Sequence, residues 1–176
     1  QPQDGQFIKL NTNENPYGPS PRVIAAVAEE AQRLRLYPDP ESEPVKRAVA
    51  QRFGVSPEQI FVGNGSDEVL AHVFLALLQH ELPILFPDVT YSFYPVFAQL
   101  YEIAYEAVPL DARFGVRVGD YVRPNGGIVI ANPNAPTGMA LPAADFEWLL
   151  DRNPDSVLVV DEAYVDFGAE SVVPLV

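Results

Sequence analysis

The sequence contains no cysteine and is poor in basic residues. Without cysteine the chain can form neither a disulfide nor a thiolate metal site, and we expect it to bind no metal. Eleven Lys and Arg residues against 24 Asp and Glu residues give a formal net charge of −13. Nucleic acids and anionic membranes attract clusters of basic side chains, so this balance argues against both and favours small molecules or proteins as partners.

Long apolar runs and targeting signals are missing as well. The longest apolar run is too short to span a membrane and the start of the chain does not resemble a signal peptide, so we expect a cytoplasmic protein. The 176 residues are 48% hydrophobic and 20% charged. These fractions are typical of a globular domain with its own core.

Apolar and polar segments alternate along most of the chain. The pattern predicts helices at residues 20–35, 42–53, 69–78 and 141–152, another that opens within 87–95 and ends near 101, and strands at residues 60–62, 83–86, 103–110, 127–131 and 157–160. Ser20 followed by Pro21 is a typical helix start, and Gly54 a typical helix end. Strands that alternate with helices indicate an α/β fold, with a mainly parallel sheet, helices on both faces, and an N-terminal arm and helices before it.

The strand predicted at residues 157–160 organises the candidate site. Its uninterrupted apolar residues are typical of a strand buried on both faces in the middle of a parallel sheet. Asp161 follows at its carboxyl end, and Tyr164 comes one short turn later. Ligands of open α/β sheets bind beyond the carboxyl ends of the strands, and a carboxylate there needs a cationic or hydrogen-bonding partner. We therefore expect Asp161 to meet a positively charged ligand atom.

A glycine-rich turn, Gly-Asn-Gly-Ser-Asp-Glu at residues 63–68, joins the strand predicted at 60–62 to a helix. In such a turn free backbone N–H groups and the helix dipole converge on an anion, usually a phosphate, and Ser66 can both cap the helix and touch the ligand. The alternative is an ordinary turn whose glycines only allow tight geometry. The turn lacks the lysine of a Walker A loop and is not a dinucleotide-binding glycine motif.

Tyr91 and residues 132–138 follow two further predicted strands. Tyr91 is placed to stack on a flat ring, with core packing as the alternative, whereas Phe93, Tyr94 and Phe97 are interpreted as core residues. Residues 132–138 form a rigid turn with two amide side chains. The carboxyl edge of the predicted sheet thus carries an anion cradle, a stacking ring, amide and phenol groups and a carboxylate. This set suits a phosphorylated, flat, basic heterocycle.

Five motifs, in this order, resemble those of the histidinol-phosphate aminotransferases, which are fold-type I transaminases dependent on pyridoxal phosphate. They are Leu-Asn-Thr-Asn-Glu-Asn-Pro-Tyr-Gly at residues 10–18, Tyr-Pro-Asp at 37–39, the turn at 63–68, Asn-Pro-Asn-Ala-Pro-Thr-Gly at 132–138 and Asp-Glu-Ala-Tyr at 161–164. The resemblance covers essentially the whole chain. It implies amino transfer between histidinol phosphate and 2-oxoglutarate, in histidine biosynthesis.

The same resemblance implies roles for individual residues. Asp161 would pair with the pyridine nitrogen of pyridoxal phosphate and keep the ring an electron sink, Tyr164 would bind its 3′ oxygen, and Tyr91 would stack on the ring. Ser66 and Asp67 would offer backbone amides to the cofactor phosphate. These residues are therefore the expected cofactor site.

The N-terminal arm has an implied role too. Tyr37 would reach the cofactor phosphate from the other subunit of a homodimer, and Asn15 and Tyr17 would help to cover the substrate. Residues 1–54 would form the arm and helices, as part of a small domain. Residues 55–176 would form the first part of the cofactor-binding large domain, with the remainder outside this chain.

One residue of the implied site departs from the family pattern. The family most often has an Asn directly before the Pro of its Asn-Asn-Pro-Thr-Gly motif, where the Asn bonds the 3′ oxygen, whereas this chain has Ala135. Asn134 or Asn132 is the expected substitute for that contact.

The Schiff-base lysine of the family is a second departure. It follows the Asp-Glu-Ala-Tyr motif by a few tens of residues, so we expect it beyond Val176, together with the arginine that holds the substrate acid group. The only lysines of the sequence are Lys9 and Lys46, and neither is predicted at a strand end. We therefore expect no catalytic residue in this chain, and expect the 176 residues alone to be inactive.

Three kinds of alternative function remain open: another reaction on the same scaffold, an ATPase and a binding domain. Aromatic amino-acid transamination and threonine-phosphate decarboxylation occur on closely similar scaffolds. Residues 159–163 also resemble the Walker B strand of an ATPase, but that interpretation needs an upstream Gly-Lys-Ser/Thr loop, which the sequence lacks. The third is a binding domain without catalytic activity.

Overall fold

The computed structural model describes residues 11–176. Residues 1–10, and with them Lys9, lie outside the described residues. The chain forms two compact units, Gln1–Glu41 and Ser42–Val176. The division of a longer protein into a small domain up to residue 54 and a large domain after it stays a prediction.

The described part of the first unit is helical. Helix α1 (Pro21–Glu30) is followed by a 3-10 helix, Ala31–Arg33. The predicted helix start is confirmed, because the Ser20 Oγ accepts a hydrogen bond from the backbone N–H of Val23 at 3.4 Å and Pro21 occupies the first helical position. A side-chain oxygen at this place satisfies an N–H that has no partner within the helix.

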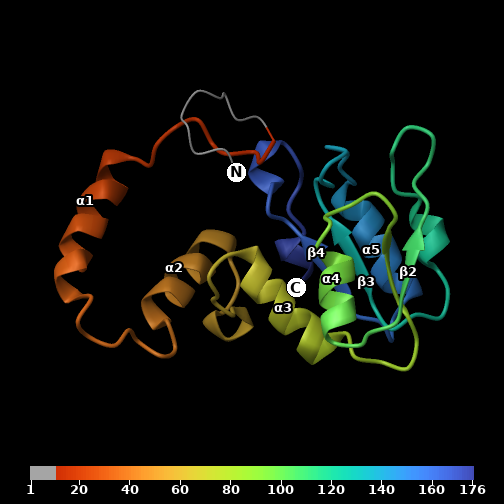
Figure 1. The fold of residues 1–176 in the computed structure, drawn as a ribbon, viewed down its shortest axis with the longest axis horizontal. Helices are drawn as coiled ribbons and strands as arrows, with labels where there is room; N and C mark the ends of the chain where they lie inside the picture. The colour runs from red at the N-terminus through yellow and green to blue at the C-terminus, as the bar shows by residue number, and fades with distance from the viewer. Residues whose placement is uncertain (1–10) are drawn as a thin grey trace. The chain divides into compact units, whose positions relative to one another are not determined.

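The second unit is an α/β structure (Figure 1). Its helices and strands are α2 (Glu43–Phe53), α3 (Ser66–Leu77), β1 (Ile84–Pro87), α4 (Tyr94–Leu100), β2 (Tyr105–Val108), β3 (Ile128–Ala131), α5 (Ala143–Arg152) and β4 (Leu158–Asp161). Gly54 ends α2 with a φ of 74°, as predicted for a helix end. The predicted parallel sheet is confirmed: all its pairings are parallel, in the order β2-β1-β3-β4.

The strand order changes direction between β1 and β3. From β1 the chain passes to β2 on one side and then to β3 on the other. In open α/β sheets such a switch leaves a crevice at the carboxyl ends of the strands, and ligands bind there. The carboxyl end of β3 is aligned with that of β4, because Ala131 pairs with Asp161.

Side chains alternate between the two faces of the sheet and build two cores. On one face, Phe86 and Val129 pack with Phe74 of α3 and Tyr94 of α4. On the other face, the strand residues pack against α5; the buried members of this second core are Leu85, Val108, Tyr121, Ile128, Ile130, Phe146, Leu149 and Val172. The expectation of helices on both faces is therefore confirmed.

One strand prediction is wrong. Residues 60–62 form no strand, and Phe61 is 64% exposed, because no neighbouring strand pairs with this short apolar segment. Within the described residues, β4 pairs with β3 alone and its residues are half-buried. The prediction that this strand lies in the middle of a parallel sheet stays a prediction, since the remainder of the large domain is predicted to lie outside this chain.

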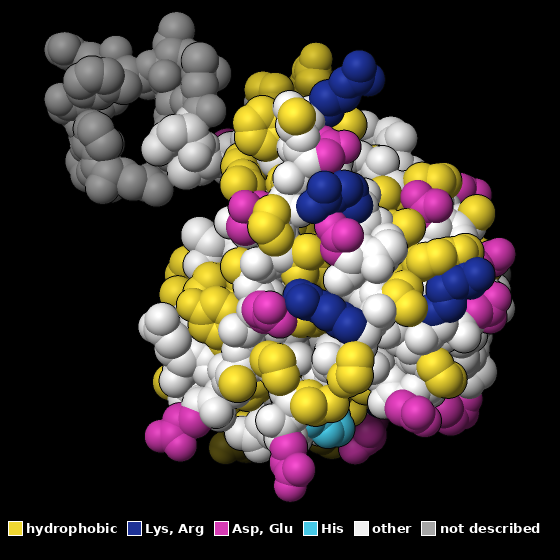
Figure 2. Space-filling view, turned by 90° about the vertical axis from the view of Figure 1, so that its right-hand side faces the viewer, with side chains coloured by type: hydrophobic (Ala, Val, Ile, Leu, Met, Phe, Trp, Pro, Cys, Tyr) yellow, Lys and Arg dark blue, Asp and Glu magenta, His cyan; other side chains and the backbone are white. Residues whose placement is uncertain are grey.

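Charges of both signs are mixed on the surface. Figure 2 shows a face on which basic side chains are dispersed among acidic and apolar ones. Among the exposed ion pairs of the second unit, one joins Arg117 to Asp120 at 2.8 Å and another joins Arg123 to Glu106 at 3.2 Å. Exposed pairs of this kind contribute at most ~1 kcal/mol each to stability. Within residues 11–176, no helix is long and apolar enough to cross a membrane.

Just before β3, the backbone at Gly126 lies very close to the backbone of residues 82–83. Gly126 donates its N–H to the Pro83 carbonyl at 2.9 Å, and a methyl group at Gly126 would overlap the backbone carbonyl of Leu82. We predict that Gly126→Ala lowers the free energy of unfolding of the full-length protein by about 1–3 kcal/mol, because backbone must move to accept the methyl group. Chemical denaturation measures this change.

Gly119→Ala is the matched control, because nothing lies within 4 Å of the added methyl group. We expect it to change the free energy of unfolding by less than ~0.5 kcal/mol. Equal stability of the two variants would contradict the close approach of the two backbones.

Candidate functional site

A cavity of about 120 Å³ lies at the carboxyl ends of β3 and β4. It is lined by residues that follow three strands and begin one helix: Ser66, Asp67, Tyr91, Ala131, Pro133, Ala135, Asp161, Ala163 and Tyr164. Pockets that enclose a ligand usually measure about 300–1,000 Å³. The cavity formed by the described residues is therefore smaller than a usual ligand pocket. Three of the lining residues are alanines, which leave room for a flat ring.

Asp161 is the last residue of β4, and both of its carboxylate oxygens accept a hydrogen bond. The Tyr94 hydroxyl donates to Oδ2 at 2.9 Å, and the backbone N–H of Ala163 donates to Oδ1 at 3.1 Å. Two donors of this kind stabilise the charge of a carboxylate that lies partly out of water. Asp161 is thus held at the cavity as an oriented hydrogen-bond acceptor.

The sequence predicts Tyr94 only as a core residue, and its hydrogen bond to Asp161 is a finding of the structure. Its ring is fully buried. Burial and the adjacent Asp161 carboxylate raise the pKa of Tyr94 well above its ordinary value, so its hydroxyl remains a donor. A signal was present in the sequence, because a buried tyrosine hydroxyl and a carboxylate at the end of an apolar strand each require a partner.

Tyr91 lines the cavity, and its hydroxyl forms a hydrogen bond with a residue of the first turn of α3. The hydroxyl donates to Asp67 Oδ1 at 2.7 Å. The Tyr91 ring lies parallel to that of Phe93, with an interplanar angle of 17°, and edge-on to that of Tyr94. Burial, together with the hydrogen bond to Asp67 and its charge, raises the pKa of Tyr91 to about 12. The interpretation of Phe93 as a core residue is wrong, since Phe93 is 44% exposed.

The glycine-rich turn leads directly into α3. Gly65 has a φ of 83°, a conformation that side-chain-bearing residues rarely adopt, and it precedes Ser66, the first residue of the helix. Ser66 therefore does not cap the helix with its side chain, contrary to prediction. The N–H groups of the first helical turn have no partner within the helix, and the helix dipole is positive there. Ser66 and Asp67 bring this end of α3 to the cavity.

Neither Asn132 nor Asn134 lines the cavity, and the amide groups of both are bound elsewhere. Asn134 is buried; its Oδ1 accepts from the Thr90 hydroxyl at 2.7 Å, and its Nδ2 donates to the Val89 carbonyl at 2.9 Å. Asn132 exchanges two hydrogen bonds with the backbone of Leu141. The cavity is lined instead by Ala135, so these asparagines hold the turn and are unsuited to replace the missing ligand contact.

The remaining predicted site residues lie in different parts of the molecule. Tyr164 lines the cavity, three residues after Asp161. Asn15, Tyr17 and Tyr37 belong to the first unit. There the Asn15 side chain accepts the Tyr17 N–H at 2.9 Å, and both tyrosine side chains are largely exposed. The roles of these three residues stay predictions.

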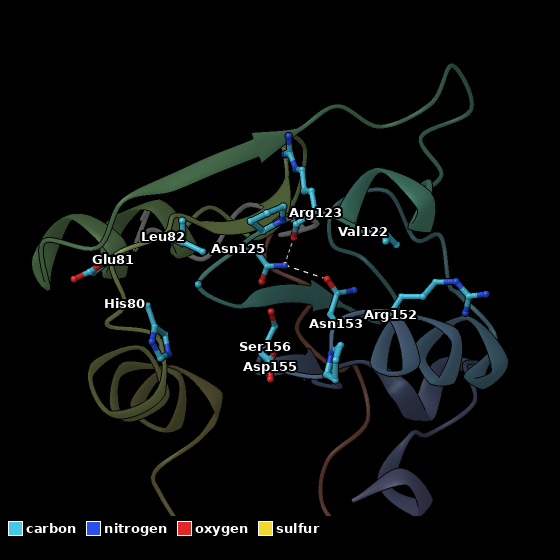
Figure 3. A pocket seen from close by; sticks show the side chains of 13 residues that line it. His80, Glu81, Leu82, Val122, Arg123, Asn125, Arg152, Asn153, Asp155 and Ser156 are labelled. Carbon is cyan, nitrogen blue, oxygen red and sulfur yellow. Dashed lines mark hydrogen bonds between the residues drawn. The ribbon is translucent and has the colours of Figure 1, made fainter.

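A larger hollow of about 710 Å³ lies near the amino ends of the strands (Figure 3). Its buried polar groups bond to one another: Asn125 Nδ2 donates to the Arg123 carbonyl at 2.8 Å and to Asn153 Oδ1 at 3.1 Å. The side chains of Arg123 and Arg152 extend in different directions. The hollow lies between the start of β3 and the end of α5. Its polar groups bind one another and do not converge on one point where a ligand could sit. Among residues 11–176, no group of three His, Asp or Glu side chains is placed to hold a metal ion.

The fold and the cavity define a class of protein. The family model for class I and II aminotransferases matches residues 5–176. The chain belongs to this family.

The individual relatives are more specific. The chain is 63% identical to histidinol-phosphate aminotransferase 1 of Pseudomonas aeruginosa, over all of this chain and 50% of that protein. It is 62% identical to histidinol-phosphate aminotransferase 1 of Bradyrhizobium diazoefficiens, over all of this chain and 50% of that protein. The crystal structure of histidinol-phosphate aminotransferase from Sinorhizobium meliloti in complex with pyridoxal-5'-phosphate matches with a TM-score of 0.79 and 26% identity, over 88% of this chain and 44% of that one. The chain thus spans about half the length of the curated relatives it matches.

The raised pKa of Tyr91 leads to a prediction about alkaline stability. An unfolded tyrosine loses its proton near pH 10, whereas Tyr91 in the folded state holds it to about 12. The folded state therefore binds this proton more tightly, and the contribution to stability is complete below pH 10 and lost as the pH rises toward 12. We predict that Tyr91→Phe makes the loss of stability between pH 10 and 12 less steep. Denaturant midpoints measured across this range for both proteins test it.

Tyr94 and Tyr121 also have raised pKa values, so part of the alkaline loss should remain in the Tyr91→Phe variant. If the wild type and the variant lose stability in parallel, the pKa of Tyr91 is not raised in the folded state and the prediction is wrong.

Proposed function

We propose that the protein containing this chain is a pyridoxal-phosphate-dependent histidinol-phosphate aminotransferase that acts as a homodimer. The reaction is amino transfer between histidinol phosphate and 2-oxoglutarate. The observation that carries the proposal is the hydrogen-bonded carboxylate of Asp161 at the carboxyl end of β4, in a cavity that also receives the start of α3 and the Tyr91 ring. The names of the relatives at 63% and 62% identity support the substrate.

The cavity residues fit the cofactor by their chemistry. Pyridoxal phosphate, when bound, supplies a positively charged pyridine ring that withdraws electrons from the carbon losing its proton. Asp161 is the residue that would keep the proton on the ring nitrogen, since it is the carboxylate oriented at the cavity by two donors. The amides of Ser66 and Asp67 at the start of α3 would bind the phosphate, as helix N-termini do.

Two tyrosines would contact the ring of the cofactor. Tyr164 would donate its hydroxyl to the 3′ oxygen, and the Tyr91 ring would cover one face of the cofactor. Asn134 is left out of the proposed site because its amide is bound within the turn. Ala135 lines the cavity where the family usually has an amide, so Tyr164 would bind the 3′ oxygen without help from that position.

The alternatives have less support. Aromatic aminotransferases would share the cofactor contacts, and only the substrate separates the two assignments. An ATPase would require Asp161 to bind Mg²⁺, whereas its carboxylate accepts hydrogen bonds from Tyr94 and Ala163 beside alanines and a proline. Comparison of kcat/KM for histidinol phosphate and for phenylalanine in the full-length protein decides the substrate. A higher value for phenylalanine would contradict the proposal.

The role of Asp161 leads to a prediction about turnover. Asn has the same shape but cannot hold a proton on the ring nitrogen by its charge. We expect Asp161→Asn in the full-length protein to lower kcat by about 10²-fold or more, because the charge acts where the transition state develops. Steady-state kinetics with histidinol phosphate measure it. The control is Asp166→Asn, a nearby exposed acid outside the cavity lining, which should leave kcat unchanged. If Asp161→Asn turns over at the wild-type rate, the proposed role of Asp161 at the ring nitrogen is wrong.

The proposed homodimer leads to a second prediction. If Tyr37 serves the site of the other subunit, a dimer of one Tyr37→Ala subunit and one Asp161→Asn subunit has both defects in one site and none in the other. A statistical mixture should then recover about a quarter of wild-type activity, since half of the dimers are mixed and half of their sites are intact. The activity of refolded mixtures measures it. Recovery no greater than that of the separate variants would mean that Tyr37 acts within its own chain.

A further inference from the structure

Tyr94 and Asp161 form a contact between a core residue and the proposed cofactor site. The Tyr94 hydroxyl donates to Asp161 Oδ2 at 2.9 Å, while Oδ1 accepts the N–H of Ala163 at 3.1 Å. Among the described residues each oxygen therefore has one donor, and Asp161 lines the cavity with lone pairs to spare for a ligand.

The position of the Tyr94 hydroxyl is determined by the core. The ring is fully buried and packs against Phe74 at a centroid distance of 6.2 Å and against Phe86 at 6.0 Å. It meets the Tyr91 ring edge-on, at 5.6 Å and 80°. A ring enclosed on these sides has little freedom to move. Its hydroxyl is thus a donor held in place before any ligand arrives.

We propose that Tyr94 is a positioning residue for Asp161: its hydroxyl orients the carboxylate toward the ring nitrogen of the cofactor. The inference rests on the proposed function, because Asp161 meets a ring nitrogen only if pyridoxal phosphate binds in this cavity. It extends that function by one residue that the sequence predicts only as part of the core.

The physical reason is the orientation of the carboxylate. A charge-assisted hydrogen bond from a donor that the core holds in place fixes the position of one carboxylate oxygen, and with it the direction of the whole group. Loss of the Tyr94 hydroxyl removes one of the two donors and lets the carboxylate turn about its remaining bond to Ala163. The interaction with the ring nitrogen is then weaker and less well oriented.

The test uses the apo form of the full-length protein and two probes. One is pyridoxal phosphate, and the other is its carbocyclic analogue, in which a C–H group replaces the ring nitrogen. Tyr94→Phe keeps the buried ring and removes only the hydroxyl. We expect it to weaken binding of pyridoxal phosphate about tenfold, the usual effect of one hydrogen bond to a charged group. We expect less than about a twofold effect on the analogue, which offers Asp161 no partner.

The chain supplies a matched control in Tyr121. It is only 1% exposed, and its hydroxyl has no hydrogen-bond partner among the described residues. Tyr121→Phe should leave the affinity for both probes unchanged. Combining Tyr94→Phe with Asp161→Asn should add no further discrimination between the probes, because Tyr94 acts through Asp161. Melting temperatures of all variants report any general loss of stability.

Each outcome has one meaning. A loss of affinity for pyridoxal phosphate alone, absent from the Asp161→Asn background, supports the positioning role. Equal losses for both probes, or no loss for either, overturn it and leave Tyr94 as a core residue. A wild-type protein that binds no pyridoxal phosphate overturns the proposed function itself, whereas one that binds and transaminates while Tyr94→Phe behaves like wild type overturns only this inference.

Discussion

The two-residue alternation of side chains along the strands determines both the core and the site. On β3 and β4, Val129, Ala131 and Val159 face the side of the sheet covered by α3 and α4. Asp161 follows Val159 by two residues and so points to the same side, where Tyr94 of α4 meets it. A shift of one residue would turn Asp161 toward α5 and away from the cavity. The hydrophobic residues that hold the sheet thus also aim the carboxylate.

A second consequence concerns charge. The cavity contains two carboxylates, Asp67 and Asp161, and its described lining includes neither Lys nor Arg. A phenol donates to each acid: Tyr91 to Asp67 and Tyr94 to Asp161. Phenols stabilise the two charges without cancelling them, so the cavity keeps its negative charge for a cationic ligand atom. The Tyr91 and Tyr94 rings also pack edge-on against each other, so the two phenols that bind the acids are in contact.

Most residues of the candidate site could be located from the sequence. Each of Ser66, Tyr91 and Asp161 stands beside an apolar segment that ends at the carboxyl edge of a parallel sheet or begins the following helix, and such edges converge. Asn134 could not be judged in this way. It lies in the same turn as Ala135, but its amide bonds to Thr90 and Val89, more than forty residues away in the chain, and only the folded structure brings those groups together.

The sequence by itself determined the types of most elements, the helix boundaries at Ser20 and Gly54, and the edge of the sheet at which the functional groups gather. These properties depend on local periodicity, capping and turn chemistry, which neighbouring residues carry. The tertiary structure alone decided that residues 60–62 form no strand, that the Asn134 amide bonds to Thr90, and that the Tyr94 hydroxyl reaches Asp161. Strand pairing and buried hydrogen bonds join residues far apart in the chain, and nothing in a local pattern records which distant partner each group will meet.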